Sequence, residues 1–436
     1  MADFARSAHP GVQAQLDRLA KLSPAGDRLG LERILALLDH LGRPQDSLPP
    51  VFHVAGTNGK GSTVAFLRAA LEAAGFKVHA FTSPHLVRFN ERIRVAGKLI
   101  ENEPLAALLA EVLDASADIE PSFFEVATAV AILAFARTPA DACILEVGLG
   151  GRLDSTNVID HPAVTGIASL ALDHQHFLGN KLPDIAAEKA GIAKAGVPLV
   201  TQLYPPPISS RIWQVAKDKG ALWLPRGTRW DAAVRRGRIH YRDAHGTLDL
   251  PLPRLPGKHQ AMNAALAVAM IRHQRALEVP ESALHTAMRT ANWPARMQQL
   301  TEGPLTRLLP PGSELWLDGG HNPSAARAIA EFVQLRFGQD LPLVLVFASL
   351  GNKDPKGMLS PFRGLASQVL TLPIGDHDCR APGELADLGR SLDFRAEPYD
   401  ALSDALAAVR IPSRVLIFGS LYLAGEALAA NGEIPS

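Results

Sequence analysis

The chain has 436 residues, too many for one ordinary hydrophobic core, which predicts two domains. Lysine plus arginine and aspartate plus glutamate number 44 each, so no basic excess favours nucleic acid or an anionic membrane. No apolar run approaches the roughly 20 residues of a membrane span, and the N-terminus lacks the apolar core of a signal peptide. Two cysteines form no disulfide framework, so we expect a cytoplasmic protein.

Short apolar runs alternate with amphipathic helical stretches along the chain. The predicted strands are 78–82, 142–147, 164–168, 198–201, 314–317, 343–347 and 415–418. The predicted helices are 104–113, 125–135, 185–193, 259–272 and 324–337. This alternation is typical of parallel sheets covered on both faces, in which ligands gather at the carboxyl ends of the strands.

The segment 54–63, VAGTNGKGST, has the features of a phosphate-binding loop. An apolar run precedes it and a helical pattern follows it. Glycines let backbone N–H groups turn toward a phosphate, the helix N-terminus adds partial positive charge, and Lys60 reaches the outer phosphates. The strict P-loop pattern is not met, because Gly61 follows Lys60 and Val54 stands where the first glycine should. The alternative is a glycine-rich surface turn.

The order of these elements predicts an α/β protein of two parts. The first, over 1–297, is a P-loop-like ATPase domain with a mostly parallel sheet. The second, over 298–436, is a smaller Rossmann-like α/β domain that begins where the segment MQQLTEG leaves the last motif of the first part. Residues 220–255 differ from their surroundings, since Trp, Arg and Gly alternate with short β-like pieces, and we predict a small antiparallel insert there.

Three further residues are candidates for chemistry by residue type. Glu146 ends an apolar strand pattern beside the phosphate loop, where a carboxylate suits Mg²⁺; the alternative is a solvated acid at a strand end. From the residues alone, His174 is a general base or a loop histidine, since imidazole is an unusual Mg²⁺ ligand. Lys189 lies in a helical pattern and, from the residues alone, is a solvent-facing lysine.

The motifs together resemble one family in their spelling and their order. They are GTNGKGS (56–62), TSPHLVRFNERIRV (82–95), EVGLGGRLDSTN (146–157), LDH (172–174), EKAGI (188–192), PGKHQAMNA (256–264), WPARMQ (293–298) and LDGGHNP (317–323). This set is similar to that of the folylpolyglutamate synthases, within the Mur ligase superfamily, and the blocks cover most of the chain.

The resemblance implies ATP and Mg²⁺ as cofactors and assigns residues to them. It implies that Lys60, Glu146, His174 and Lys189 are catalytic, with Ser83, Glu146, His174 and Lys189 holding metal and Asp173 orienting the histidine. It further implies that CO₂ carboxylates the Lys189 amine, which requires a neutral lysine and therefore burial. The implied nucleotide-binding residues are Thr57, Asn58, Gly59, Lys60, Gly61, Ser62, Asn263, Arg296, Asp318 and His321. The alternatives are a helix-face amide for Asn263 and a turn-capping carboxylate for Asp318.

Three segments match those that contact a pterin in the bifunctional bacterial members of the family. They comprise Asp27, Arg28 and Leu29; Ser122, Phe123, Phe124 and Glu125; and Leu153, Asp154 and Ser155. An aromatic ring such as Phe124 can stack on a pteridine, and the Asp154 carboxylate can accept from its N–H donors. Phe124 as part of the core is the competing interpretation.

The resemblance implies a carboxylate–amine ligase that adds L-glutamate to dihydropteroate and to folates through an acyl phosphate. The expected partners are these small molecules, without nucleic acid or membrane, and a monomer is expected. One alternative is a folylpolyglutamate synthase only. Another is a Mur-type ligase of cell-wall precursors, against which the TSPHL and LGGRLDSTN blocks argue. A non-catalytic nucleotide-binding module is the third, opposed by the intact catalytic set.

Overall fold

A computed structural model describes residues 5–22, 29–338 and 340–436, which form two compact units. Unit 1 comprises the chain up to Arg254 together with His259–Asn292, and unit 2 comprises Leu255–Lys258 and Trp293–Ser436. Residues 255–258 and 293–297 thus pack with the C-terminal unit. The division into functional domains at 297 stays a prediction.

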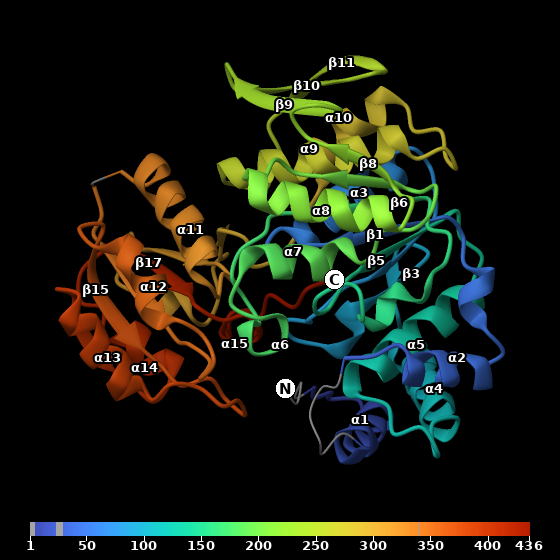
Figure 1. Ribbon diagram of the computed structural model, residues 1–436. Coiled ribbons are helices and arrows are strands. Elements are labelled where there is room, and N and C mark those ends of the chain that lie inside the picture. Colours follow the sequence, from blue (N-terminus) through green and yellow to red (C-terminus); the bar gives the residue numbers. More distant parts are fainter. Residues whose placement is uncertain (1–4, 23–28, 339) are drawn as a thin grey trace. The chain divides into compact units, whose positions relative to one another are not determined.

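An eight-stranded sheet forms the centre of unit 1, in the order β4-β3-β2-β5-β1-β6-β7-β8 (Figure 1). Its strands are β1 Val51–Ala55, β2 Val78–Phe81, β3 Ile93–Val95, β4 Lys98–Leu99, β5 Ala142–Glu146, β6 Val164–Ile167, β7 Pro198–Thr201 and β8 Leu222–Pro225. The run from β2 to β8 is parallel, and β3 and β4 add an antiparallel edge. β1, β2 and β5 are buried along their whole length, as expected where helices cover both faces.

The helices of unit 1 cover both faces of this sheet, either directly or by packing on other helices. They are α1 Pro10–Leu22, α2 Glu32–His40, α3 Lys60–Ala73, α4 Asn102–Asp114, α5 Phe123–Ala136, α6 Gln175–Leu178, α7 Leu182–Ala190, α8 Pro206–Asp218, α9 Lys258–His273 and α10 Glu281–Thr290, with 3₁₀ turns η1 Pro44–Ser47, η2 Phe89–Arg92 and η3 Ser155–Val158. Because side chains alternate along a strand, Val51 and Ala55 share one face of β1. Val51 packs in an apolar cluster with α5, and Ala55 in one with α7 and α8. On β6, Gly166 leaves room for Met270 of α9.

The predicted insert in 220–255 is present as a three-stranded antiparallel sheet. It contains β9 Trp230–Arg235, β10 Arg238–Asp243 and β11 Gly246–Pro251, whereas β8 in the same range belongs to the main sheet. Arg272 of α9 holds the insert through two hydrogen bonds of 2.7 Å to the carboxylate of Asp243.

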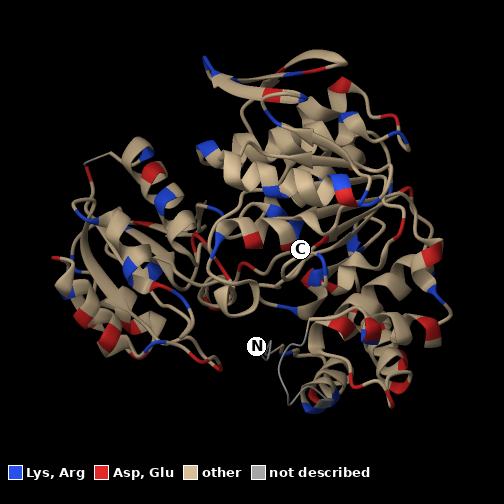
Figure 2. Cartoon of the chain, viewed as in Figure 1, with Lys and Arg blue, Asp and Glu red and all other residues tan. Residues whose placement is uncertain are grey.

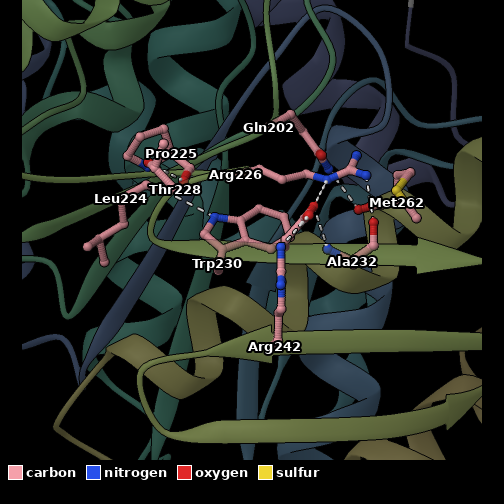
Figure 3. Close-up of polar contacts among 10 residues, drawn as sticks. Gln202, Leu224, Pro225, Arg226, Thr228, Trp230, Ala232, Arg242 and Met262 are labelled. Carbon is pink, nitrogen blue, oxygen red and sulfur yellow. Dashed lines mark hydrogen bonds and ion pairs between the residues drawn. The ribbon is translucent and has the colours of Figure 1, made fainter.

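A second attachment of the insert lies at the end of β8 (Figure 3). Arg226 donates to the backbone carbonyl of Ala232 at 2.6 Å, and the Trp230 indole donates to the carbonyl of Leu224 at 3.1 Å. Gln202 donates to the carbonyl of Met262 at 2.7 Å and so links the end of β7 to α9. The bonds of Arg226 and Trp230 thus hold the insert at the same end of its sheet as Asp243, which pairs with Trp230.

Unit 2 has a six-stranded sheet in the order β12-β13-β17-β14-β15-β16. Its elements are β12 Gln298–Gln299, η4 Thr306–Leu308, β13 Glu314–Leu317, α11 Pro323–Arg336, β14 Leu343–Phe347, α12 Pro355–Leu359, η5 Ser360–Phe362, β15 Ala366–Thr371, α13 Pro382–Ser391, β16 Arg395–Pro398, α14 Leu402–Ala407, β17 Arg414–Phe418 and α15 Leu421–Asn431. Only the short β12 is antiparallel to its neighbour. The apolar core includes Phe347, Phe362 and Phe418.

The α/β class is confirmed, and each predicted strand and helix is present with ends that differ by at most three residues. The largest difference is at α7, which begins earlier because Pro183 suits the first turn of a helix. Acidic and basic residues are interspersed over the elements of both units (Figure 2). No helix among the described residues is long and apolar enough to cross a membrane.

Candidate active site

The predicted phosphate loop connects β1 to α3. Gly59, the residue before α3, has a φ of 85°, and a Cβ there would overlap the side-chain oxygen of Asn263. The backbone N–H groups of Thr57 and Asn58 donate to the carbonyl of Ser169 at 2.8 and 3.2 Å, which fixes the loop against the segment after β6. α3 has no side-chain N-cap. The N–H groups of its first turn therefore suit an anion.

The ends of four neighbouring strands bring the other candidates to the same edge of the sheet. Val54 of β1 lies opposite Glu146 of β5, and Phe81 of β2 lies opposite Leu145. Ser83 follows β2 and therefore lies near this edge. The Lys60 ammonium is 4.0 Å from the Glu146 carboxylate, whose side chain is only 5% exposed. The parallel register thus places the phosphate-loop lysine beside the carboxylate predicted to hold metal.

Lys189 is buried in α7, with 4% of its surface exposed, so it is not a solvent-facing lysine. Burial and the neighbouring Lys60 charge lower the pKa of Lys189 to about 7, while Asp173 and Asp154 oppose the shift. The close packing of α7 depends on Gly151, where a Cβ would lie 3.0 Å from the Lys189 Cα. A large fraction of the amine is therefore neutral at neutral pH, as predicted for this lysine.

His174 is half-buried and begins α6 in a left-handed conformation, with a φ of 50°. The buried Asp173 accepts a hydrogen bond from the backbone N–H of His174 at 2.8 Å. No group of three or more His, Cys, Asp or Glu side chains is arranged for a metal in the part of the chain that the structure describes. The hydroxyl of Ser83 and the carboxylate of Glu146 are oxygen donors that fit Mg²⁺. The complete metal set stays a prediction.

Asn263 lies in α9 beside the phosphate loop rather than on an exposed helix face. It is 5% exposed, and its Nδ2 donates to the side-chain oxygen of Gln260 at 3.1 Å. This bond turns the Asn263 carbonyl toward Gly59. Gln260 was not predicted as a site residue, although it stands in the same PGKHQAMNA block.

Two of the predicted acceptor segments meet at the start of α5. Ser122 and Glu125 form a capping box, and Arg33 donates to the Glu125 carboxylate at 3.1 Å. Phe123 is buried in the core, and the half-buried Phe124 packs against the same apolar cluster, with its ring where a Cβ at position 148 would stand. Packing with the core, the competing interpretation of Phe124, is thus present. Leu29 is half-buried, and Asp27 and Arg28 lie outside the described residues. Arg33 was not predicted as a site residue, although it ends the stretch GDRLGLER (26–33) that contains Asp27, Arg28 and Leu29.

The third predicted acceptor segment also contacts α5. Thr128 of α5 lies 2.8 Å from the hydroxyl of Ser155, and Leu153 is half-buried nearby in sequence. Asp154 is 3% exposed and accepts from the backbone N–H groups of Leu149 and Thr156 at 2.8 and 3.0 Å. It also accepts from the Thr156 hydroxyl and from the backbone of Gly148. Burial raises the pKa of Asp154, and these hydrogen bonds oppose the rise.

In unit 2, the predicted nucleotide-binding residues Asp318 and His321 follow β13, and the side chain of Arg296, which precedes β12, lies against Gly319 between them. The buried Asp318 accepts from the backbone N–H groups of Met297 at 2.8 Å and Gly320 at 2.7 Å, so it caps this turn. Arg296 donates to the carbonyl of Ala295 at 2.8 Å, and the His321 ring lies 3.0 Å from the carbonyl of Gly319. Their contact with a nucleotide stays a prediction.

Comparison with known sequences gives matches along nearly the whole chain, although no family model matches. The dihydrofolate synthase/folylpolyglutamate synthase of Escherichia coli is 37% identical over 398 residues, covering 90% of this chain and 89% of that protein. The folylpolyglutamate synthase of Lacticaseibacillus casei is 32% identical, covering 94% of this chain and 96% of that protein.

Solved structures agree with these matches. The Escherichia coli FolC protein, solved in complex with DHPP and ADP, has a TM-score of 0.86 at 34% identity and covers 98% of both chains. A bifunctional folylpolyglutamate synthase/dihydrofolate synthase, solved with Mn, AMPPNP and L-glutamate bound, has a TM-score of 0.85 at 30% identity, covering 98% of this chain and 99% of that one. The chain therefore belongs to the dihydrofolate synthase/folylpolyglutamate synthase family.

Proposed function

We propose that the chain is an ATP-dependent ligase that adds L-glutamate to dihydropteroate and to folates. The observation that carries the proposal is the edge of the unit 1 sheet, where Lys60, Glu146 and the buried Lys189 gather beside the phosphate loop. Family membership supplies the substrate class, since the relatives are named for folate ligation and were solved with ADP, AMPPNP, Mn and L-glutamate. It also favours folates over the cell-wall precursors of other Mur-type ligases.

The chemistry follows from the charges at this edge. The acceptor carboxylate takes the γ-phosphoryl group of ATP to give an acyl phosphate, and ADP leaves. The amine of L-glutamate then attacks the acyl carbon, displaces phosphate and loses its proton to give the amide. Such a transfer needs alignment and charge neutralisation rather than a nucleophilic side chain. Lys60 neutralises phosphate charge, the N–H groups of the first turn of α3 orient it, and Glu146 faces the loop. Bound Mg²⁺ would neutralise further phosphate charge, with Ser83, Glu146, His174 and Lys189 as its proposed holders.

The acceptor segments support a bifunctional enzyme. The start of α5, the Arg33 side chain and the loop of Asp154 and Ser155 lie together in unit 1, as a pterin site requires. The second candidate is an enzyme that only extends polyglutamate tails, which the name of the Lacticaseibacillus casei relative favours. A monomeric state and a cytoplasmic location belong to the same proposal.

The products of two parallel reactions test the proposed function. The protein is incubated with MgATP and L-glutamate, with dihydropteroate in one reaction and tetrahydrofolate in the other, and the products are identified by mass spectrometry. We expect dihydrofolate in the first and glutamate-extended folate in the second. If folate is extended but no dihydrofolate forms, the second candidate is correct. If neither product forms, the proposal is overturned.

Replacing Lys60 with alanine should abolish ligation with both acceptors. Lys60 lies within the phosphate loop beside Glu146, and its loss leaves transition-state charge uncompensated. Because each ~1.4 kcal/mol is tenfold in rate, a loss of several kcal/mol is about a thousandfold or more. Phosphate release gives the measurement, and Lys77→Ala, at an exposed lysine, is the control. Turnover within about tenfold of the wild type would contradict the assignment of the loop.

Lys189 should be carboxylated, and the modification should depend on pH. The pKa of about 7 means that the reactive neutral amine predominates above pH 7 and is lost to protonation as the pH falls below it. With ¹³C-bicarbonate, ¹³C NMR should show a carbamate signal at pH 8.5 that weakens toward pH 6. The signal should disappear in Lys189→Ala and persist in Lys181→Ala, whose lysine is exposed at the start of the same helix. Absence of the carbamate signal from the wild type at pH 8.5 would show that Lys189 is not carboxylated, and would contradict the prediction.

Replacing Asp154 should lower kcat/KM for dihydropteroate more than kcat/KM for tetrahydrofolate. Dihydropteroate has no glutamate tail, so its pteridine must lie closer to the γ-phosphate than that of a folate, and one carboxylate cannot bind the ring in both positions. Loss of a charge-assisted hydrogen bond should cost roughly 1.5–3 kcal/mol, about ten- to a hundredfold in kcat/KM for dihydropteroate.

The structure supplies the control for this measurement. Asp154 also holds Leu149 and Thr156, so Asp154→Ala tests both roles, whereas Asp154→Asn keeps the shape and removes the charge. Melting temperatures are measured for each variant. Equal losses of kcat/KM with both substrates, together with a lower melting temperature, would show that Asp154 only stabilises its own loop.

A further inference from the structure

We infer that His53 and Thr156 are positioning residues for the acceptor substrate, acting through a buried hydrogen-bond chain that ends on Asp154. The inference rests on the proposed function, because it concerns the acceptor site of that ligase. It assigns a role to a histidine of the strand that leads into the phosphate loop, and to a threonine outside the predicted site.

The chain of hydrogen bonds runs from the middle of the sheet to the loop after β5. His53 stands in the centre of β1, opposite Leu145 of β5, and is fully buried. Its Nε2 lies 2.8 Å from the hydroxyl of Thr156, which is fully buried as well. That hydroxyl donates to the Asp154 carboxylate at 2.5 Å, and the other carboxylate oxygen accepts from the Leu149 N–H.

The direction of each hydrogen bond follows from the number of protons. Both oxygens of Asp154 already accept from backbone N–H groups, so the carboxylate takes the single hydroxyl proton of Thr156. The threonine oxygen must then accept from His53, which places the imidazole proton on Nε2. The other nitrogen of His53 is buried and has no hydrogen-bond partner among the described residues. Thr156 is therefore the polar contact that orients the ring.

The surroundings of His53 separate this ring from an ordinary core residue. Its neighbours in β1 are Val51, Phe52, Val54 and Ala55, all apolar and buried. Burial and the Lys194 charge lower the pKa of His53 to about 3, so the ring is neutral. Placing a polar ring here costs desolvation, which an apolar side chain would avoid. The hydrogen bond to Thr156 offsets part of this cost, and an apolar side chain could not form it.

The loop after β5, where the series of hydrogen bonds ends, lies between the acceptor segment at Phe124 and Lys189. Gly148 lies against the Phe124 ring, and Gly151 lies against the Lys189 backbone, with Asp154 closing the loop between them. His53 stands only three residues before Gly56 of the phosphate loop. The hydrogen bonds from His53 to Asp154 therefore link β1, which leads into the phosphate loop, to the loop after β5, which sets the proposed position of the acceptor. Misplacement by about 1 Å can cost a hundredfold in rate.

A matched pair of variants at Thr156 tests the inference. Thr156→Val keeps the shape and removes the hydroxyl, whereas Thr156→Ser keeps the hydroxyl. KM and kcat are measured for dihydropteroate, tetrahydrofolate and ATP, with melting temperatures as the check on folding. We expect Thr156→Val to raise the KM of at least one acceptor about tenfold or more, with the KM of ATP within about twofold, and Thr156→Ser to stay within about threefold throughout.

Histidine NMR gives a second measurement that needs no catalysis. In protein labelled with ¹⁵N-histidine, the signal missing from His53→Gln belongs to His53, and it should report a neutral ring with its proton on Nε2. Thr156→Val should shift that signal. If Thr156→Val does not fold, the pair His53→Gln and His53→Leu replaces it in the kinetic test, because a glutamine amide can still donate to Thr156. Glutamine should retain acceptor binding, and leucine should lose it.

The outcomes separate failure of the inference from failure of the proposed function. Wild type without ligation would overturn the proposed function, while the NMR result would still test the hydrogen-bond chain. An active wild type in which Thr156→Val leaves acceptor KM unchanged would overturn the inference, as would equal changes in acceptor and ATP KM. A proton on Nδ1 of His53 in the wild type would overturn it as well.

Discussion

The parallel register of β2, β5, β1 and β6 is the constraint on which the site of unit 1 depends. Strands in this arrangement end at one edge, so side chains far apart in sequence meet there. Lys60 follows β1, Glu146 ends β5, and the segment after β6 bonds to the phosphate loop. The first turn of α3 contributes N–H groups, and Glu146 and Lys189 are almost fully buried at this edge. No single segment could provide this arrangement alone.

Charges of both signs meet at that edge, since the carboxylates of Glu146, Asp173 and Asp154 lie near the two lysines. Two lysines, Lys60 and Lys189, lie close enough for the charge of one to lower the pKa of the other, and one of them is buried. Bound phosphates would offset the charge of Lys60, and a carbamate on the Lys189 amine, which burial favours in its neutral form, would add a negative charge near Lys60. Either change brings opposite charges together at low dielectric. Lys60 thus lies where the proposed substrate and the proposed modification bring anions.

Much of the fold could be predicted because local signals agree with the global structure. The apolar runs that became β5 and β14 are short and bounded by turn residues, and the phosphate loop has its own spelling. Other contacts carry no local signal. His53 and Thr156 are 103 residues apart and meet only because η3 packs on β1. Gln260 and Arg33 likewise act through partners brought together by folding, and single-residue patterns do not reveal such pairs.

The hydrogen bonds of Asp154 show why a residue role is harder to predict than a position. Sequence placed this carboxylate in an acceptor segment, and the structure places it beside the other segments, but its donors are the backbone of its own loop and Thr156. A carboxylate has about four positions for donors, so a pteridine would have to share them or displace one. In the proposed acceptor site, pteridine binding and the hydrogen bonds that hold the loop would therefore use the same two oxygens. If Asp154 binds the pterin as proposed, recognition would depend on the loop as a whole, including the buried Thr156 and His53 that hydrogen-bond to it in series.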